Sequence, residues 1–327
     1  MKLLKLRLKA ERPLLYLSGN GSSSINEMDL INLGSKYRCF SYAYTCKGAF
    51  YYNKRMNQAL KTSVDNNIGV MMDSAAHSIH HLKAQGLKKN KGKFNIHDID
   101  KLRDLVMDQY VEYVNKEGKH WDFHINFDYI KNCPEIYRVQ KVLEEKGLRP
   151  VPVYHGDHGL EWLKRYCKEG YKLISIGTVI PFGTYREKRR YYDNVFNISE
   201  KYGVLLHGLA MTGLSLMFQY PWYSVDSATW AKTAAYGSML HVDMNRQIIG
   251  EIHITDQRVN GKTCWNQLPK DLQRDIRHTV EDNGFDFHEM QTDGRARSLY
   301  NVWLFCNKLH ELKDAVKSTT VKWKNLL

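Results

Sequence analysis

Apolar runs of four to eight residues recur along roughly the first 240 positions of the chain. Runs of this length that close on polar or turn-forming residues are typical of buried strands. Segments with helical periodicity lie between most of them, most clearly at residues 98–115, 134–146 and 160–169. The eight predicted strands cover residues 13–19, 37–44, 69–74, 121–128, 150–155, 171–177, 203–208 and 223–226.

Eight strands that alternate with helices predict a parallel sheet with right-handed crossovers. The economical arrangement is an α/β fold, a (β/α)8 TIM barrel over residues 1–240, with a C-terminal helical extension over residues 241–327 packed on it. Helices are predicted in that extension near residues 271–278 and 299–313. The alternative is an open doubly wound sheet, but the glycines after the first strand, Gly19 and Gly21, match its phosphate-binding fingerprint only in part.

Two of the apolar runs end on an Asp-Ser pair, at Asp73 and at Asp226, and then change to small and helix-forming residues. A barrel of parallel strands brings all its strand ends to one face, where active sites are built. Two carboxylates on that face suggest acid/base chemistry together with a nucleophile. The alternative is that each Asp merely caps the next helix. The other predicted strand ends on this face carry Asp128, His155, Gly177 and His207.

Charge and composition narrow the class of protein further. The formal net charge of +13 and the sequence pI near 9.3 favour a polyanionic partner such as DNA or RNA, although solubility alone is the alternative. A mean hydropathy of -0.52, without an apolar run near the length of a spanning helix, argues against a membrane protein. The six cysteines lie far apart and form no CxxC pair, which predicts reduced thiols in a cytoplasmic setting and no metal signature.

The strand-end residues resemble, in order and spacing, the base-exchange barrels of the tRNA-guanine transglycosylase family. The resemblance covers roughly residues 13–240, and the two Asp-Ser segments, residues 73–78 and 223–230, are its most specific parts. The second segment is closer to the phage and bacterial relatives that insert 7-deazaguanines into DNA.

This resemblance implies a glycosyltransferase in which Asp226 is the nucleophile on the sugar C1′ and Asp73 is the general acid/base. Exchange of one base for another with retained configuration needs such a covalent intermediate, and burial should raise the pKa of the second carboxyl. Flipping of the target nucleotide would use a basic rim and aromatic residues such as Tyr220, Trp222 and Tyr223. The resemblance also implies residues that bind or enclose the base, namely Asp128, His77, His155, Gly177, Thr178, His207 and Gly208.

The chain departs from the family pattern at two places. Ala75 and Ala76 replace the usual Gly-Gly pair, which narrows the room near the base. The three-cysteine zinc signature of the tRNA enzymes is absent, and Cys264 and Cys306 with the nearby histidines are too dispersed to replace it. Because the zinc-bearing region supports RNA binding in that family, its absence favours DNA.

The expected activity is therefore exchange of guanine in DNA for a 7-deazaguanine such as 7-cyano-7-deazaguanine, without a redox or nucleotide cofactor and without zinc. The chain would act in the cytoplasm, which is that of the host if a phage encodes it. Two alternatives stay open at this point: the same exchange on tRNA, and a non-catalytic barrel that binds nucleic acid.

Overall fold

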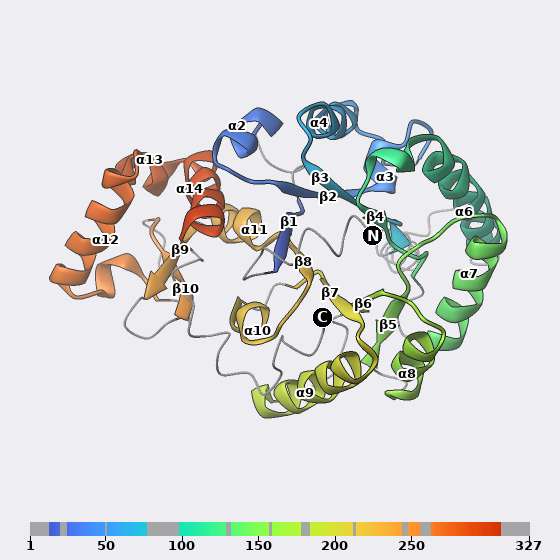
Figure 1. Ribbon diagram of the computed structural model, residues 1–327. Coiled ribbons are helices and arrows are strands. Elements are labelled where there is room, and N and C mark those ends of the chain that lie inside the picture. Colours follow the sequence, from blue (N-terminus) through green and yellow to red (C-terminus); the bar gives the residue numbers. More distant parts are fainter. Residues whose placement is uncertain are drawn as a thin grey trace.

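In a computed structural model of the protein, eight parallel strands form the central sheet (Figure 1). The structure describes residues 13–19, 25–49, 51–76, 98–128, 132–156, 159–177, 184–211, 214–243, 248–255 and 263–308. The strands pair in the order β4-β3-β2-β1-β8-β7-β6-β5. Their bounds are β1 Leu14–Leu17, β2 Tyr37–Ser41, β3 Gly69–Asp73, β4 Phe123–His124, β5 Val153–His155, β6 Leu173–Gly177, β7 Leu205–Leu209 and β8 Ser224–Ser227.

The two ends of this sheet meet and close it into a barrel. Ile125, directly after β4, forms a parallel bridge with Val151, just before β5. The amide of Val151 donates to the carbonyl of His124 at 2.8 Å, and the amide of Asn126 donates to the carbonyl of Val151 at 2.9 Å. An open doubly wound sheet has no such closing pair, so the (β/α)8 TIM barrel expected from the sequence is confirmed.

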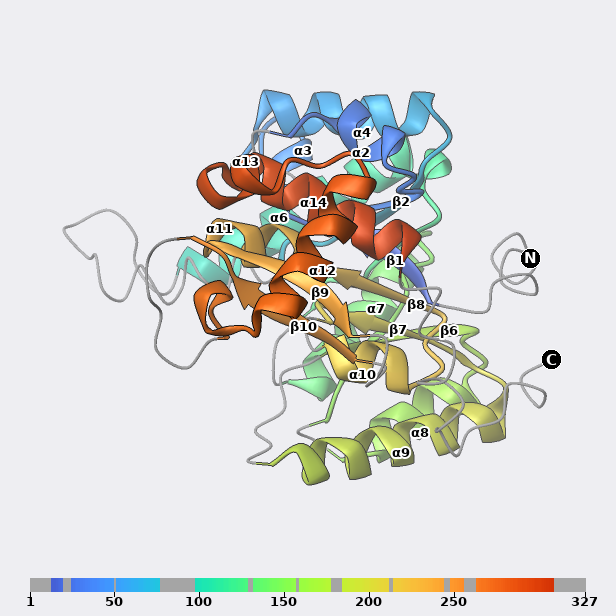
Figure 2. The ribbon, with the colours of Figure 1, turned by 90° about the vertical axis from the view of Figure 1, so that its left-hand side faces the viewer.

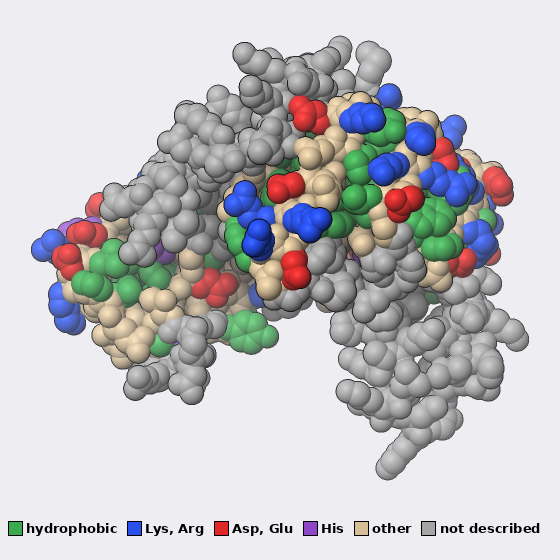
Figure 3. All heavy atoms as spheres, turned by 90° about the horizontal axis from the view of Figure 1, so that it is seen from below, with side chains coloured by type: hydrophobic (Ala, Val, Ile, Leu, Met, Phe, Trp, Pro, Cys, Tyr) green, Lys and Arg blue, Asp and Glu red, His purple; other side chains and the backbone are tan. Residues whose placement is uncertain are grey.

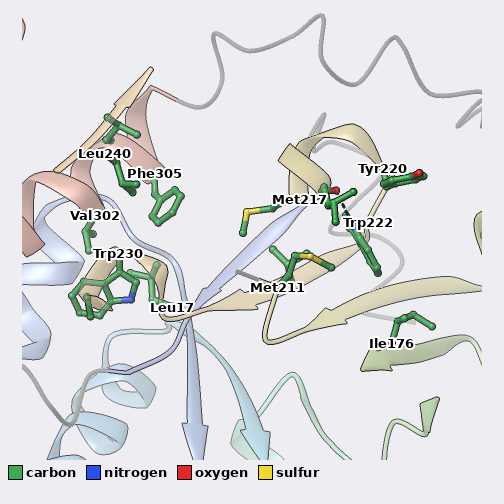
Figure 4. Close-up of a cluster of buried hydrophobic side chains, with 14 of the residues drawn as sticks. Leu17, Ile176, Met211, Met217, Tyr220, Trp222, Trp230, Leu240, Val302 and Phe305 are labelled. Atoms are coloured by element: carbon green, nitrogen blue, oxygen red, sulfur yellow. Dashed lines mark hydrogen bonds between the residues drawn. The ribbon is translucent and has the colours of Figure 1, made fainter. Parts of the chain in front are cut away.

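Helices cover the outside of the barrel and bury the outward-facing side chains of the strands (Figures 1 and 2). Figure 4 shows part of this outer core, in which Met211, Met217 and Trp222 gather beside the strands and Trp230 lies near Val302 and Phe305. The amphipathic helices α4 and α9 contribute buried apolar side chains to it. The helices between the strands are α2 Glu27–Asn32, α3 Tyr42–Thr45, α4 Lys54–Asp65, α6 Asp98–Glu117, the 3-10 turn η2 Gly118–His120, α7 Cys133–Glu145, α8 Glu161–Lys168, α9 Tyr185–Tyr202 and α10 Leu214–Gln219, and α11 Thr229–Ala235 follows β8. None of the helices in the described part of the chain combines the length and the apolar character needed to cross a lipid bilayer.

The predicted strand over residues 37–44 ends early. β2 stops at Ser41, and Tyr42 begins the short helix α3. The hydroxyl of Thr45 donates to the carbonyl of Ser41 at 3.1 Å, and the amide of Cys46 donates to the carbonyl of Tyr42 at 3.1 Å. A short apolar run is equally compatible with a strand and with a buried helical turn, so the sequence pattern could not show where the strand ends and the helix begins.

The C-terminal part begins with a hairpin that the sequence pattern did not reveal. β9 (Ser238–Asp243) pairs antiparallel with β10 (Ile248–His253), so the hairpin straddles the boundary predicted at residue 240. The 3-10 turn η4 (Trp265–Gln267) and three helices follow. These helices are α12 Lys270–Asp282, α13 Phe287–Thr292 and α14 Gly294–Asn307. The predicted helices at residues 271–278 and 299–313 correspond to α12 and to the second half of α14, and residues 309–313 lie outside the described chain.

Buried polar groups fasten α14 to the barrel. The side chain of Asn301 accepts from the amide of Leu240 at 2.8 Å and donates to the carbonyl of Trp230 at 3.0 Å. The guanidinium of Arg297 donates to the last turn of α11, at the carbonyl of Ala234. These bonds satisfy backbone groups that would otherwise be left unpaired at the interface, and they fix the C-terminal helices against α11 and β9.

Candidate active site

The interior of the barrel alternates with its outer layer along each strand. Cys39, Met71 and Val153 belong to the apolar cluster that fills the barrel. Because side chains of a strand alternate between its two faces, residues two positions later also point inward. Ser41, Asp73 and His155 occupy these positions at the carboxyl ends of their strands.

Asp73 ends β3 in a mostly enclosed position. Its Oδ2 accepts a hydrogen bond from the amide of Ala75 at 3.0 Å. The pKa of Asp73 is raised to about 6, chiefly by burial and further by the negative charges of Asp226 and Asp128, against the opposing effects of the Ala75 amide and the Ser41 hydroxyl. A carboxyl with this pKa can hold and release a proton near neutral pH, as a general acid/base requires.

Asp226, on β8, is held by different contacts. The amide of Ala210, which follows β7, donates to Oδ1 of Asp226 at 2.7 Å. Nε2 of His207 lies 3.4 Å from the same oxygen, and Nδ1 of His207 lies 2.8 Å from the hydroxyl of Ser224. If the His207 imidazole is neutral with its hydrogen on Nε2, its Nδ1 accepts a hydrogen bond from the Ser224 hydroxyl and its Nε2–H is directed toward the Asp226 carboxylate. These contacts fix the direction in which the Asp226 carboxylate points.

The carboxylates of Asp73 and Asp226 influence the same groups although their strands are not neighbours. β3 and β8 are separated by β2 and β1, roughly 14 Å along the sheet at the usual spacing of strands. Burial raises the pKa of the Cys39 thiol between them, and the charges of both Asp226 and Asp73 add to this effect. The two carboxylates therefore lie near each other at the carboxyl ends of the strands, close enough for the charge of Asp226 to act on Asp73.

A third carboxylate, Asp128, is paired with His155 at the same end of the barrel. Nε2 of His155 lies 2.9 Å from Oδ1 and 2.8 Å from Oδ2 of Asp128. Gly177 is the residue paired with His155 on the neighbouring strand, and a Cβ built on it would fall 2.2 Å from Cε1 of the imidazole. Only glycine leaves room for this ring, so Gly177 serves the placement of His155.

Two of the residues expected beside the base, His207 and Gly208, have other surroundings. His207 is completely buried, with its ring against Phe123 at 5.4 Å between centroids, so it offers no accessible face to a base and instead contacts Asp226. Gly208 faces the outer core, where a Cβ would lie 3.1 to 3.3 Å from Val225, Met211 and Trp222. His77 and Thr178 lie outside the described residues.

The aromatic residues expected to support base flipping are core residues. Tyr220, Trp222 and Tyr223 are each 3% exposed or less. The Trp222 indole donates to the carbonyl of Leu216, and the Tyr220 ring stacks on Phe196. The expectation that these rings support base flipping is therefore wrong, because an aromatic residue next to a strand packs into the core as readily as it faces solvent.

Ala75 adopts a backbone conformation that glycine favours. Its φ is +69°, in the left-handed region, and its side chain is fully buried. Alanine is strained in this region, which costs roughly 1 kcal/mol or more. The turn that places the Ala75 amide on Asp73 therefore carries this strain.

Two contributors to the site were missed in the sequence analysis. The Ser224 hydroxyl orients His207, and the amide of Ala210 binds Asp226. Ser224 could have been found, because it lies two positions before Asp226 and so on the same face of the strand. The Ala210 amide could not, since its direction depends on a backbone φ of +50° in the turn after β7.

The residues present do not fit the zinc site of the tRNA enzymes. All six cysteines are free, and within the described ranges no three His, Cys, Asp or Glu side chains gather as metal ligands would. Cys264 is buried beside His253, whose ring nitrogens lie near the hydroxyls of Ser238 and Thr255. We therefore derive no step through a metal.

The fold and site define a (β/α)8 barrel with three carboxylates at the carboxyl ends of its strands. No family model matches the chain, and no curated protein matches it either. Among solved structures the chain is similar to the tryptophan synthase alpha chain from Legionella pneumophila subsp. pneumophila, at 11% identity and a TM-score of 0.41. That similarity covers 98% of this chain and 97% of the other. Proposals about function therefore depend on the residues of the site.

Proposed function

We propose that the protein is a transglycosylase that exchanges guanine in DNA for a 7-deazaguanine base, such as 7-cyano-7-deazaguanine. The observation that carries this proposal is the contrast between two carboxyls at one barrel mouth. Asp226 is oriented by a backbone amide and a buried imidazole, whereas the pKa of Asp73 is raised to about 6. Contrasting environments of this kind assign one carboxyl as nucleophile and the other as proton carrier.

In the first half of the reaction an oxygen of Asp226 forms a bond to the sugar C1′ while the C1′–N9 bond of guanine breaks. The electron pair of that bond moves onto guanine, and protonated Asp73 supplies the proton that neutralises the leaving base. In the second half Asp73 takes a proton from the incoming deazaguanine, whose N9 attacks C1′ and releases Asp226. Guanine and 7-deazaguanine are thus exchanged with no net change in protonation or oxidation state.

The pair formed by Asp128 and His155 would bind the base. Asp128 accepts the imidazole N–H and retains carboxylate lone pairs that can accept from the N–H groups on the purine edge. Gly177 leaves the room that the His155 imidazole occupies, since a Cβ at this position would overlap the ring. The resemblance to the guanine transglycosylases supports the same assignment.

DNA is preferred to tRNA as the substrate because the chain lacks the three-cysteine zinc signature of the tRNA enzymes. The net charge of +13 is suited to either nucleic acid. The same protein preparation should therefore be offered both substrates.

The test is incubation of the protein with a panel of deazaguanines and with DNA or tRNA that carries radiolabelled guanine. The released guanine is measured by its label, and the nucleosides of the digested nucleic acid are identified by mass spectrometry. We expect release of guanine from DNA together with gain of the deazaguanine nucleoside. Asp226→Ala should abolish both while the protein stays folded, and the matched control Asp108→Ala removes an exposed carboxylate on α6 together with its ion pair to Lys146. Exchange confined to tRNA would move the proposal to the alternative substrate, and exchange by Asp226→Ala at the rate of the unchanged protein would reject the nucleophile.

A further inference from the structure

Three tyrosines lie between the carboxyl end of β2 and the start of α4, and we call them the tyrosine rim: Tyr44, Tyr51 and Tyr52. Tyr44 is 38% exposed and Tyr52 is 39% exposed. The rings of Tyr44 and Tyr51 are stacked, with centroids 5.6 Å apart and planes 20° from parallel. Because β2 pairs with β3, this rim adjoins the strand that carries Asp73.

The backbone of the tyrosine rim is held by its own hydrogen bonds. The amide of Asn53 donates to the carbonyl of Tyr44 at 2.9 Å, and the amide of Tyr52 donates to the carbonyl of Ala49 at 3.0 Å. Asn57 on α4 donates to the carbonyl of Thr45 at 2.7 Å. The exposed rings are thus presented on a preformed support, which lowers the entropy lost when a ligand stacks on them.

A cluster of cations begins α9, directly across the barrel from the tyrosine rim. Its members, all exposed, are Arg186, Lys188, Arg189 and Arg190, and we call them the α9 basic end. The single acidic residue among them, Glu187, accepts hydrogen bonds from Thr184 in the capping box of the helix. The N-terminal end of the helix dipole adds further positive potential.

The two features lie on opposite sides of the site. α9 follows β6 as α3 and α4 follow β2, so both begin at the carboxyl ends of strands, and β2 and β6 are four positions apart in the ring of eight. Figures 1 and 2 both show α4 and α9 on opposite sides of the barrel. Figure 3, which views the molecule from the side of α9, shows Lys and Arg side chains on this face, interspersed with acidic ones.

We propose that an unpaired stretch of polynucleotide crosses the barrel mouth, with bases stacked on the tyrosine rim and phosphates bound by the α9 basic end. This inference rests on the proposed function, because it takes the reacting nucleotide to lie between the two features. Cations alone would suit any polyanion, and exposed rings alone would suit an apolar surface. Together they match a strand in which bases and phosphates alternate. The carboxylates between them repel phosphate and leave the centre to a neutral base.

The binding test uses an oligothymidine of about 16 nucleotides, which contains no guanine and so cannot react. Tyr44→Ala with Tyr52→Ala should weaken binding roughly five- to hundredfold and leave the salt dependence unchanged. Replacement of all four residues of the α9 basic end by Ala should weaken binding and make the log–log salt slope shallower by roughly 1.5 to 3, since each lost phosphate contact on a single strand accounts for about 0.7.

Matched controls lie at the opposite end of the barrel. Tyr236→Ala removes a tyrosine that is 71% exposed, at the end of α11. A fourfold Ala variant of exposed lysines at the carboxyl ends of helices removes the same charge; its sites are Lys116, Lys168, Lys201 and Lys232. Equal losses in the control and rim variants, or oligothymidine binding that neither rim change affects, would overturn the inference. Rim-dependent binding without any base exchange would reject the transglycosylase and retain the polynucleotide surface.

Discussion

The raised pKa of Asp73 makes a prediction about stability that is independent of any substrate. Burial favours the protonated form of Asp73, so the ionised carboxylate that is present near pH 7.5 destabilises the folded protein. Asp73→Asn keeps an oxygen for the Ala75 amide and removes the charge. We therefore expect the variant to be more stable than the unchanged protein while it loses exchange activity by at least about 10²-fold.

The size and the sign of the effect follow from the two pKa values of Asp73. The usual value is 3.8 and the value in the folded protein is about 6, so the folded state binds more protons between these limits and stability falls as the pH rises through them. The difference between the two pKa values lowers the free energy of unfolding by about 3 kcal/mol near pH 7.5 and by about 1 kcal/mol near pH 4.5, relative to a side chain that stays neutral. Removing the charge should thus stabilise the protein increasingly as the pH rises through this window, with nearly the full gain present above pH 6.

Denaturant unfolding of the unchanged protein and of Asp73→Asn at both pH values measures this difference. The free energy of unfolding should rise by about 3 kcal/mol near pH 7.5, with a clearly smaller gain near pH 4.5. Asp108→Asn, at an exposed ion pair with Lys146, is the matched control and should change stability by less than about 1 kcal/mol at either pH. A loss of stability in Asp73→Asn, or an equal gain at both pH values, would show that Asp73 acts only as a cap for the following turn.

Three further changes test how the site and its support are built. Ser224→Ala should slow guanine release roughly 10-fold without changing oligothymidine affinity, because His207 loses the bond that orients it; an unchanged rate would separate this histidine from the reaction. Gly177→Ala should destabilise the protein by roughly 1–3 kcal/mol and raise the KM for the incoming base, because its Cβ would displace His155; an unaltered KM would remove this imidazole from base binding. Glu27→Ala should lower the free energy of unfolding by roughly 3–5 kcal/mol, because it removes the carboxylate that neutralises the buried guanidinium of Arg38. A loss below about 1 kcal/mol in denaturant unfolding would contradict that reasoning.

The sequence by itself determined the barrel and most of its strand ends. Eight apolar runs with helical segments between them admit few parallel arrangements, and several of the runs end on a polar residue that the local pattern marks. Asp73, Asp128, His155 and Asp226 all lie at the mouth of the barrel, as expected. This part was predictable because it depends on periodicity along single strands, which the order of residues encodes directly.

The tertiary structure decided what these residues contact. The order of residues does not show that His207 is buried against Asp226, or that Gly177 lies beneath an imidazole, because both depend on pairs of strands packed across the sheet. The burial of Tyr220, Trp222 and Tyr223 and the exposure of Tyr44 and Tyr52 depend on which face of each element the helices cover. Local pattern places a side chain on its strand or helix, whereas its partners, its burial and its pKa arise only when distant segments are brought together.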